Sequence, residues 1–496
     1  MSVFDCLVVV LYLAGTLALG IWSGRKVWTI REFAVDPGRF STVALYATIF
    51  ATYIGGWSTI GIAEKTFSTG IVMSVISIIG SLDLLLIGIF VAPKMGKFLG
   101  NAISPGEVAG LFWGRSGVVM TGVTGMLYSL AGAAVQVSAI GRIFHYMMGV
   151  SFELGAWIGF GMLVVYSAFG GIRAVVATDK IQYAVLAFAI PLVTYFAVAG
   201  AGGLQTVFTA APAGNIDISP LWTEPFRYLP ILASYLICII NPVWMQRLLM
   251  GRDIQQLQKT FCLGTLTVPL AYICATLIGL SALVSSPAIE PSSVMAHTIN
   301  TIVPIGFKGI VISGLLAVLM STADSYLNIA GVMLACDVLF SKTAKGAGSR
   351  EMLRYSRLTT LGLGLLSLVV ALYFKDIINI ALYFDGFWYS TVAVPIMVSI
   401  LGYRSTRHAF NWASWVGGGT VALWLIFDME GKTGIYGFFP GMTLNALLLF
   451  GLSAYGKRSG IFTREEEERI RKGMEAVDKL KKLQKKVSRK RPRAKG

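Results

Sequence analysis

"ATYIGGWSTIG" at residues 51–61 places two adjacent glycines, Gly55 and Gly56, in the middle of an apolar run. The run has the length and composition of a membrane-spanning helix. Each glycine lowers helix propensity by about 1 kcal/mol, and a helix in lipid can give up backbone hydrogen bonds only where protein or a water-filled cavity satisfies them. The pair indicates either close packing against a neighbouring helix or a discontinuous helix whose free carbonyl groups bind an ion or a solute.

The composition of the chain is that of an integral membrane protein. Of its 496 residues, 55% are hydrophobic and 13% are charged, whereas soluble domains carry about 25% charged residues. Apolar runs of about 20 residues recur from end to end, which indicates a polytopic helical protein. A transmembrane β-barrel would show shorter, alternating segments. We therefore expect a multi-pass protein of a cell membrane, either plasma or bacterial inner membrane, in contact with lipid.

The distribution of basic residues predicts the orientation of the spans. We expect thirteen apolar spans, centred near residues 12, 54, 82, 132, 162, 192, 238, 272, 322, 364, 388, 418 and 445. One set of alternate loops, in which Arg247 is counted, holds 19 Lys and Arg, the C-terminal tail adds 16, and the other set holds six. Because cytoplasmic loops are enriched in Lys and Arg, the N-terminus is expected outside and the C-terminus in the cytoplasm.

The net charge of +16 follows mostly from this topology. Residues 456–496 form a basic cytoplasmic tail, which we expect to be a helix that is solvated or touches lipid headgroups. A regulatory docking element is the alternative. The charge does not indicate nucleic-acid binding.

A second interruption, Asn241-Pro242, lies inside the apolar run LICIINPVWMQRL at residues 236–248. Proline removes a backbone donor and breaks or kinks a helix. If the first span, within residues 1–40, is peripheral, the glycine pair opens a five-helix unit at 41–205 and Asn241-Pro242 opens a second at 225–402. Two such units are inverted relative to each other, and interrupted helices at matching positions indicate a midplane binding site in a secondary transporter. Residues 403–455 add two helices, so the transporter domain is expected to cover residues 1–455.

A third stretch, LLAVLMSTADSYLNIAG at residues 315–331, is too polar for a passive span. Ser321, Thr322 and Ser325 share one face by their helical spacing. Hydroxyl groups set against free carbonyl groups form an all-oxygen site, which suits a small hard cation such as Na⁺. The alternative is that these hydroxyl groups bond to carbonyl groups of their own helix.

Four motifs occur in one order and spacing: FATYIGGWSTIG (50–61), SAFGGIRAVVATDKIQ (167–182), NPVWMQRLLMGRD (241–253) and LLAVLMSTADSYLNIAG (315–331). Together they resemble the sodium:solute symporter family, which includes the sodium/glucose cotransporters and bacterial proline permease. The resemblance implies an all-α, leucine-transporter-type fold with a five-plus-five inverted repeat, one helix before it and two after it. It also implies alternating access coupled to Na⁺.

The resemblance further implies an ion site. Carried over position by position, the Na⁺ ligands are the carbonyl groups of Ala51, Ile54 and Val318 and the hydroxyl groups of Ser321 and Thr322. Asp179 matches a family aspartate near the cytoplasmic exit route of Na⁺. The alternative for Asp179 is an interfacial carboxylate paired with Lys180 or Arg173.

The resemblance does not reach the solute, because the cavity positions depart from the family patterns. The sugar transporters carry a substrate-contacting Asn in the vicinity of Tyr53, and proline permease carries an acidic residue at its place. Trp57 matches a Trp of the proline permease pattern, and its indole could cap the site. Asp83 and Asp385 should face a cavity or a partner, because an ionised carboxylate at mid-bilayer costs about 2.5–3.5 kcal/mol.

Two interpretations of these carboxylates stay open. Each could be a protonated acid bonded to a neighbouring helix or half of an ion pair; alternatively, Asp385 receives a proton or a cationic or amine-bearing solute, covered by neighbouring aromatic rings. Gln136 is favoured for helix–helix hydrogen bonding. The full set of cavity candidates is Tyr53, Gly55, Gly56, Trp57, Asp83, Gln136, Asn241, Phe384, Asp385, Trp388 and Tyr389.

These observations predict a Na⁺-coupled importer of a small organic solute of the amino acid, amine or carboxylate class. The alternative is a transporter-like membrane sensor that signals through a separate partner. An enzyme is not expected, because Glu64 and the three histidines are dispersed and form no nucleophile–base set in the sequence.

Overall fold

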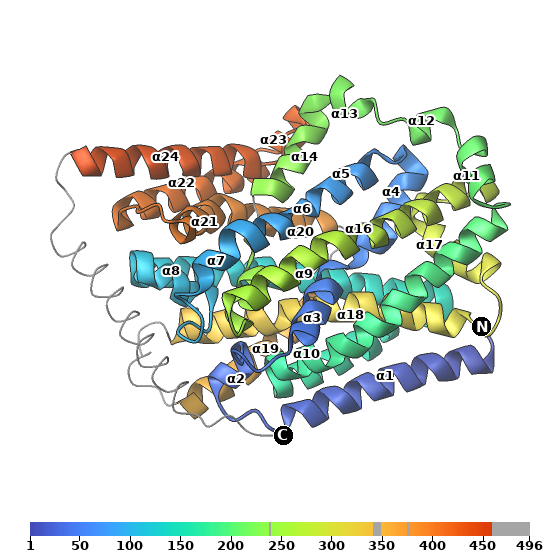
Figure 1. Cartoon of the computed structure of the whole chain (residues 1–496), viewed down its shortest axis with the longest axis horizontal. Helices are drawn as coiled ribbons and strands as arrows, with labels where there is room; N and C mark the ends of the chain where they lie inside the picture. The colour runs from blue at the N-terminus through green and yellow to red at the C-terminus, as the bar shows by residue number, and fades with distance from the viewer. Residues whose placement is uncertain (238–239, 341–348, 374–376, 459–496) are drawn as a thin grey trace.

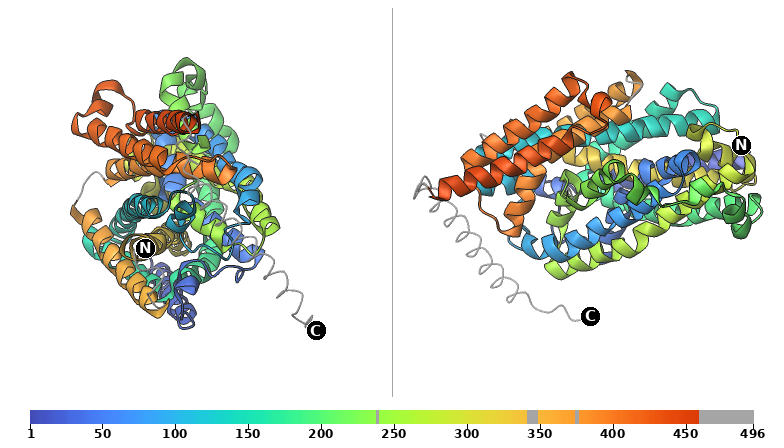
Figure 2. Two further views of the ribbon diagram at one scale, coloured as in Figure 1. Left: turned by 90° about the vertical axis from the view of Figure 1, so that its left-hand side faces the viewer. Right: turned by 90° about the horizontal axis from the view of Figure 1, so that it is seen from above.

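The computed structural model describes residues 1–237, 240–340, 349–373 and 377–458, and these residues form an all-helical bundle. Most long helices run roughly alongside one another, with α1 at one edge and α22 and α24 at the opposite edge (Figure 1). The end-on view shows the same arrangement, with the N-terminal and C-terminal helices on opposite sides (Figure 2). The predicted tail lies beyond residue 458 for all but its first residues, and so outside the described residues.

Residues 3–285 form eighteen of the ordered elements, two short π-helical segments included. Their bounds are α1 Val3–Gly24, α2 Ile30–Ala34, α3 Thr42–Tyr53, η1 Trp57–Gly61, α4 Ile62–Thr69, α5 Val72–Gly80, α6 Leu82–Leu86, η2 Ile87–Val91, α7 Ala92–Met95, α8 Pro105–Trp113, α9 Arg115–Met148, α10 Phe152–Gly200, α11 Leu204–Ala210, α12 Ala213–Ile216, α13 Pro220–Thr223, α14 Pro225–Ile237, α15 Pro242–Met250 and α16 Ile254–Ser285.

The rest of the chain follows the same pattern of long helices joined by short elements. Their bounds are η3 Pro291–Ser293, α17 Val294–His297, η4 Thr298–Ile302, α18 Lys308–Val332, η5 Met333–Leu339, α19 Ser349–Tyr373, α20 Ile377–Trp388, η6 Tyr389–Ala393, α21 Val394–Leu401, α22 Arg407–Ile426, α23 Met429–Thr433 and α24 Phe438–Arg458.

Nine helices within the described residues are long and apolar enough to cross a membrane, or ten if one bent pair counts as a single span. The bent pair is α3 with η1–α4, which holds the glycine pair. The span centres predicted near residues 162 and 192 both fall in α10, which bends at Gly171. There φ is +53° and ψ is −144°, a conformation that a residue with a Cβ rarely adopts.

Helix α18 lies at the centre of the bundle. In its most apolar window 89% of the residues are buried, the largest share among the candidate spans. Its N-terminus receives Asp5 of α1, whose carboxylate accepts hydrogen bonds from the amides of Gly306, at 3.2 Å, and Gly309, at 2.9 Å. A carboxylate at a helix N-terminus is stabilising. The peripheral helix α1 is therefore tied to the helix that carries the predicted hydroxyl ligands.

Candidate ion and solute site

The helix that contains the glycine pair is interrupted. Helix α3 ends at Tyr53, Ile54 is extended with φ −81° and ψ +94°, and the chain resumes as η1 at an angle of 56° to α3. Two hydroxyl groups, those of Ser58 and Thr59, each donate to the Gly55 carbonyl at 3.0 Å, and the Gly55 amide donates to Ser58 Oγ at 2.9 Å. Side chains thus replace backbone hydrogen bonds at the break, as a discontinuous helix in a membrane requires.

Helix α18 places its hydroxyl pair directly against this break. Ser321 Oγ lies 2.8 Å from the Ala51 carbonyl oxygen and 3.0 Å from that of Val318. Thr322 Oγ1 lies 3.1 Å from the Val318 oxygen and 3.5 Å from that of Ile54. The five predicted oxygens therefore meet in one buried cluster, although two helices far apart in the chain contribute them.

A buried polar network adjoins this cluster, and Arg247 lies at its centre. The prediction for Arg247 was wrong. Arg247 was counted among the loop cations, but its side chain is fully buried. Its guanidinium donates to Thr52 Oγ1 at 3.1 Å and to Ser325 Oγ, and lies 4.0 Å from Asp179 Oδ2. The reason is the second interruption: α15, which starts just after it, is buried along its whole length.

Asp179 is also fully buried, so the alternative interpretation, an interfacial carboxylate paired with Lys180 or Arg173, is wrong. Its Oδ2 accepts a hydrogen bond from Thr48 of α3 and faces Arg247. Arg173 instead pairs with Glu32 at 3.0 Å and with Asp36 at 2.5 Å.

A second buried carboxylate, Asp324 of α18, completes this network. It accepts a hydrogen bond from Tyr166 at 2.8 Å and a longer one from Thr178 at 3.4 Å. The network therefore holds two carboxylates and one guanidinium, all fully buried.

The second interruption is organised by Asn241 and Trp388. Helix α15 begins at Pro242, and Asn241 Oδ1 accepts a hydrogen bond from the Trp244 amide at 2.9 Å, so Asn241 is the N-cap of α15. The Trp388 indole is fully buried and donates to the Ile240 carbonyl at 3.0 Å. The Asn241 Oδ1 atom and the Trp388 indole N–H are therefore both engaged in hydrogen bonds at this break.

The other cavity candidates form two separate contacts, one at Tyr53 and one at Gln136. The Tyr53 hydroxyl group lies 3.2 Å from Asp83 Oδ1, and its ring stacks on that of Trp244 with 5.7 Å between the centroids. Gln136 Oε1 accepts a hydrogen bond from the Gly56 amide at 3.4 Å, which matches the helix–helix role predicted for it. Trp57 is 40% exposed.

Asp385 is half-buried and differs from the buried carboxylates Asp83, Asp179 and Asp324. Within the part of the chain that the structure describes, no group donates a hydrogen bond to its carboxylate and no basic side chain pairs with it. Its neighbours Phe384 and Tyr389 are half-buried.

The comparisons with known proteins agree with this architecture. The family model described as "Sodium:solute symporter family" matches residues 33–417, which is most of the chain. The chain belongs to the sodium:solute symporter family. As a member it is a multi-pass membrane protein that couples transport of a small organic solute to Na⁺.

The curated relatives of this symporter are distant, and two bacterial ones match over nearly their full length. The chain is 22% identical over 452 residues to the high-affinity proline transporter PutP of Bacillus subtilis (strain 168), covering 88% of this chain and 95% of the relative. It is 21% identical over 474 residues to the sodium/proline symporter of Escherichia coli (strain K12), covering 90% and 92%. It is 24% identical over 404 residues to solute carrier family 5 member 4 of Rattus norvegicus, covering 71% and 60%.

Solved structures share the fold of this symporter. A Na⁺-coupled sialic acid symporter in a substrate-bound, outward-open state superposes with a TM-score of 0.82 at 18% identity, covering 92% of this chain and 97% of that one. The nucleobase-cation-symport transporter MHP1 superposes with a TM-score of 0.56 at 15% identity, covering 88% and 98%.

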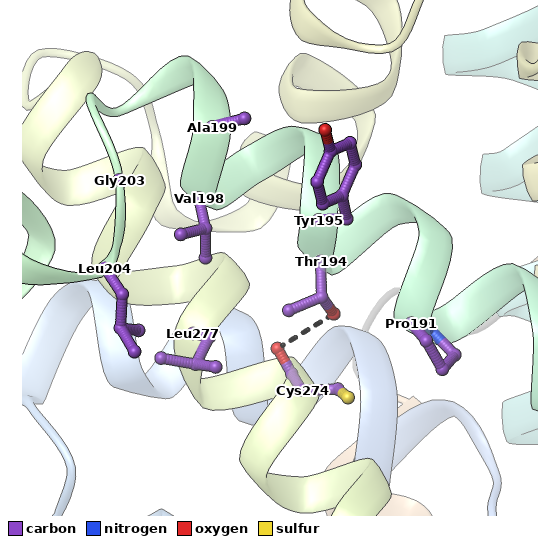
Figure 3. A pocket seen from close by; sticks show the side chains of 9 residues that line it. All are labelled: Pro191, Thr194, Tyr195, Val198, Ala199, Gly203, Leu204, Cys274 and Leu277. Carbon is purple, nitrogen blue, oxygen red and sulfur yellow. Dashed lines mark hydrogen bonds between the residues drawn. The ribbon is translucent and has the colours of Figure 1, made fainter.

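The symporter also has a hollow that the sequence did not indicate (Figure 3). Its volume is about 440 Å³, and it lies between α10 and α16, where Thr194 Oγ1 contacts the Cys274 carbonyl at 3.4 Å. None of the predicted site residues lines it, so it is separate from the ion cluster. Its lining residues are Pro191, Thr194, Tyr195, Val198, Ala199, Gly203, Leu204, Cys274 and Leu277.

Two residues of the symporter's buried network, Arg247 and Asp324, were missed as site candidates. A signal for each was present, since Arg247 follows the Asn-Pro break by five residues and Asp324 follows the hydroxyl pair by two. Charged residues inside a membrane span face a partner or a cavity by default.

Proposed function

We propose that the chain carries its solute by alternating access, with Na⁺ bound by the carbonyl oxygens of Ala51, Ile54 and Val318 and the hydroxyl oxygens of Ser321 and Thr322. The observation that supports this site is the approach of the two hydroxyl groups to the three carbonyl groups, at 2.8–3.5 Å. An interrupted helix without such partners would leave carbonyl oxygens unpaired in the membrane, at a cost of several kcal/mol each.

The donor set fits a monovalent cation. All five ligands are neutral oxygens, and hard cations take oxygen ligands. No carboxylate belongs to the set, so the ion keeps most of its charge. The fully buried carboxyl groups of Asp179 and Asp324 lie beside the site, in one network with the guanidinium of Arg247.

Coupling follows from the two helices that share the ion. Na⁺ held between the break of α3 and the hydroxyl pair of α18 stabilises the bent form of α3, which carries Tyr53, Gly55 and Gly56 toward the solute. A solute that binds to this arranged form gains affinity, and by linkage it raises the Na⁺ affinity by the same factor. The ion exit route then passes Asp179, and Arg247 must leave Thr52 and Ser325 before the route opens.

The topology of the proposal is thirteen spans, with the N-terminus outside and the C-terminus in the cytoplasm. Moving Arg247 from the loops to the core leaves 34 basic residues against six, which does not change the orientation. The units at 41–205 and 225–402 then form the inverted repeat of a leucine-transporter-type fold, with one interrupted helix at the start of each.

The solute belongs to the small amino acid, amine or carboxylate class. PutP and the sodium/proline symporter are named for proline, so L-proline is the first candidate solute.

The test is uptake into proteoliposomes under an inward NaCl gradient, with equimolar KCl as the control. We expect Na⁺-dependent accumulation of at least one solute of this class. We also expect the purified protein to melt at a higher temperature in NaCl than in KCl. At ten times the Na⁺ dissociation constant, bound Na⁺ should raise the free energy of unfolding by about 1.4 kcal/mol. Equal melting temperatures in the two salts, together with uptake that ignores the cation, would reject the proposal.

A further inference from the structure

We infer that Asp385, with the aromatic rings around Tyr128, receives a positively charged nitrogen of the solute. This inference rests on the proposed function and narrows its solute class to compounds with a cationic nitrogen.

Asp385 faces the interior of the bundle. Phe387 lies on the opposite side of the helix, where its ring comes near Gly418 of α22, and Gly386 lies beside Val421 and Phe438 of α22 and α24. Trp388, one turn after Asp385, points toward the second interruption and bonds to the Ile240 carbonyl. Residues three and four positions apart share a helix face, so Asp385 projects on the same side as Trp388.

Despite facing inward, the Asp385 side chain keeps part of its surface accessible, whereas Asp83, Asp179 and Asp324 are buried. Since the outward faces of α20 are packed against α22 and α24, a molecule that reaches Asp385 reaches it from within the bundle.

Aromatic rings from three helices gather beside this carboxylate. The Tyr128 ring of α9 lies 5.9 Å from that of Tyr326, 6.2 Å from that of Trp388 and 6.2 Å from that of Tyr389. Tyr128 and Tyr326 both lie within electrostatic range of Asp385. Ring faces attract ammonium groups, most strongly where the cation is desolvated.

The charge pattern singles out Asp385 among the mid-span carboxylates. Asp83 receives the Tyr53 hydroxyl, Asp179 receives Thr48 and faces Arg247, and Asp324 receives Tyr166. Asp385 has no comparable donor or cation in the described part of the chain. An ionised carboxylate in this position is costly until a cation pairs with it, and a positively charged nitrogen both pairs with the carboxylate and fits the neighbouring ring faces.

The experiment compares matched probes on the purified, full-length protein in NaCl, by equilibrium binding and thermal shift. The cationic probes are choline and ethanolamine, and the neutral control is 3,3-dimethylbutan-1-ol, which has the shape of choline without the charge. We expect at least one cationic probe to bind at least tenfold more tightly than the neutral alcohol. We expect Asp385→Asn to abolish that preference, while the matched control Asp337→Asn, at a buried aspartate whose carboxylate accepts a hydrogen bond from Ser104, changes it less than threefold.

Three results would overturn the inference: no cationic probe binds, the neutral alcohol binds equally well, or Asp385→Asn retains the affinity. A protonated, purely structural Asp385 predicts the last of these. If Asp385→Asn fails to fold, the comparison of choline with the neutral alcohol on the unmodified protein still decides. Failure of the proposed function is recognised separately, because stabilisation by NaCl over KCl is measured without solute and should persist in Asp385→Asn.

Discussion

Replacing Ser321 by alanine tests the ion site most directly. Ser321 Oγ is the oxygen closest to the broken helix, 2.8 Å from the Ala51 carbonyl. A hydrogen bond or ligand contact to a charged group contributes about 1.5–3 kcal/mol. Because about 1.4 kcal/mol corresponds to a tenfold change in affinity, Ser321→Ala should weaken Na⁺ binding by roughly 10- to 150-fold. The double variant Ser321→Ala/Thr322→Ala should lose nearly all Na⁺ dependence.

The assay is the Na⁺ concentration that gives half-maximal uptake in proteoliposomes, alongside the melting temperature in NaCl and KCl. Ser313→Ala is the matched control, since Ser313 lies on the same helix, is 2% exposed, and its hydroxyl group has no hydrogen-bond partner among the described residues. That control should leave the half-maximal Na⁺ concentration unchanged. In KCl, Ser321→Ala itself should lose only about 1–3 kcal/mol of stability, from the unpaired Ala51 carbonyl.

The result that would refute this reasoning is a double variant with unchanged Na⁺ activation and normal expression. The hydroxyl groups would then be structural partners of the broken helix and nothing more. If both variants lose expression while Ser313→Ala is expressed normally, the hydroxyl groups of Ser321 and Thr322 serve folding and not Na⁺ binding.

Two further predictions concern residues around the ion site. Gly55→Ala should lower the Na⁺ affinity about tenfold, roughly 1.4 kcal/mol, with little loss of expression, because the new Cβ would lie 3.1 Å from Thr322 Oγ1. The control is Gly362→Ala, whose Cβ would meet no atom within 4 Å. The measurement is the Na⁺-activation curve of uptake for each variant. Arg247→Met should destabilise the protein by about 3–5 kcal/mol, because Asp179 is left as an uncompensated buried charge. Adding Asp179→Asn to this variant should restore part of the lost stability. A double variant that melts no higher than Arg247→Met would show that the two residues are not coupled.

The position of the interrupted helix could be predicted from local residues alone. Two glycines in an apolar run and an Asn-Pro pair in another weaken a helix wherever they occur, and the structure bends by 56° at the first of them. The hydroxyl pair was likewise visible, because Ser321 and Thr322 are adjacent in the chain. The ligand carbonyl groups and the partner helix followed from the family resemblance.

Arg247 shows where such prediction ended. As a basic residue near a span end, Arg247 resembled a loop cation. In the structure α15 packs against α3 and α18, and this packing buries Arg247 beside Asp179. The same holds for Asp179 and Arg173, which are six residues apart but find partners on different helices.

What the sequence by itself determined is therefore the membrane class, the two interruptions and the hydroxyl pair, because apolar length, helix-breaking residues and oxygen-bearing side chains act locally. The tertiary structure alone decided which buried charges are paired and that Asp385 faces inward with no partner among the described residues. Pairing depends on which helices meet, and helices far apart in the chain meet only when the whole bundle packs.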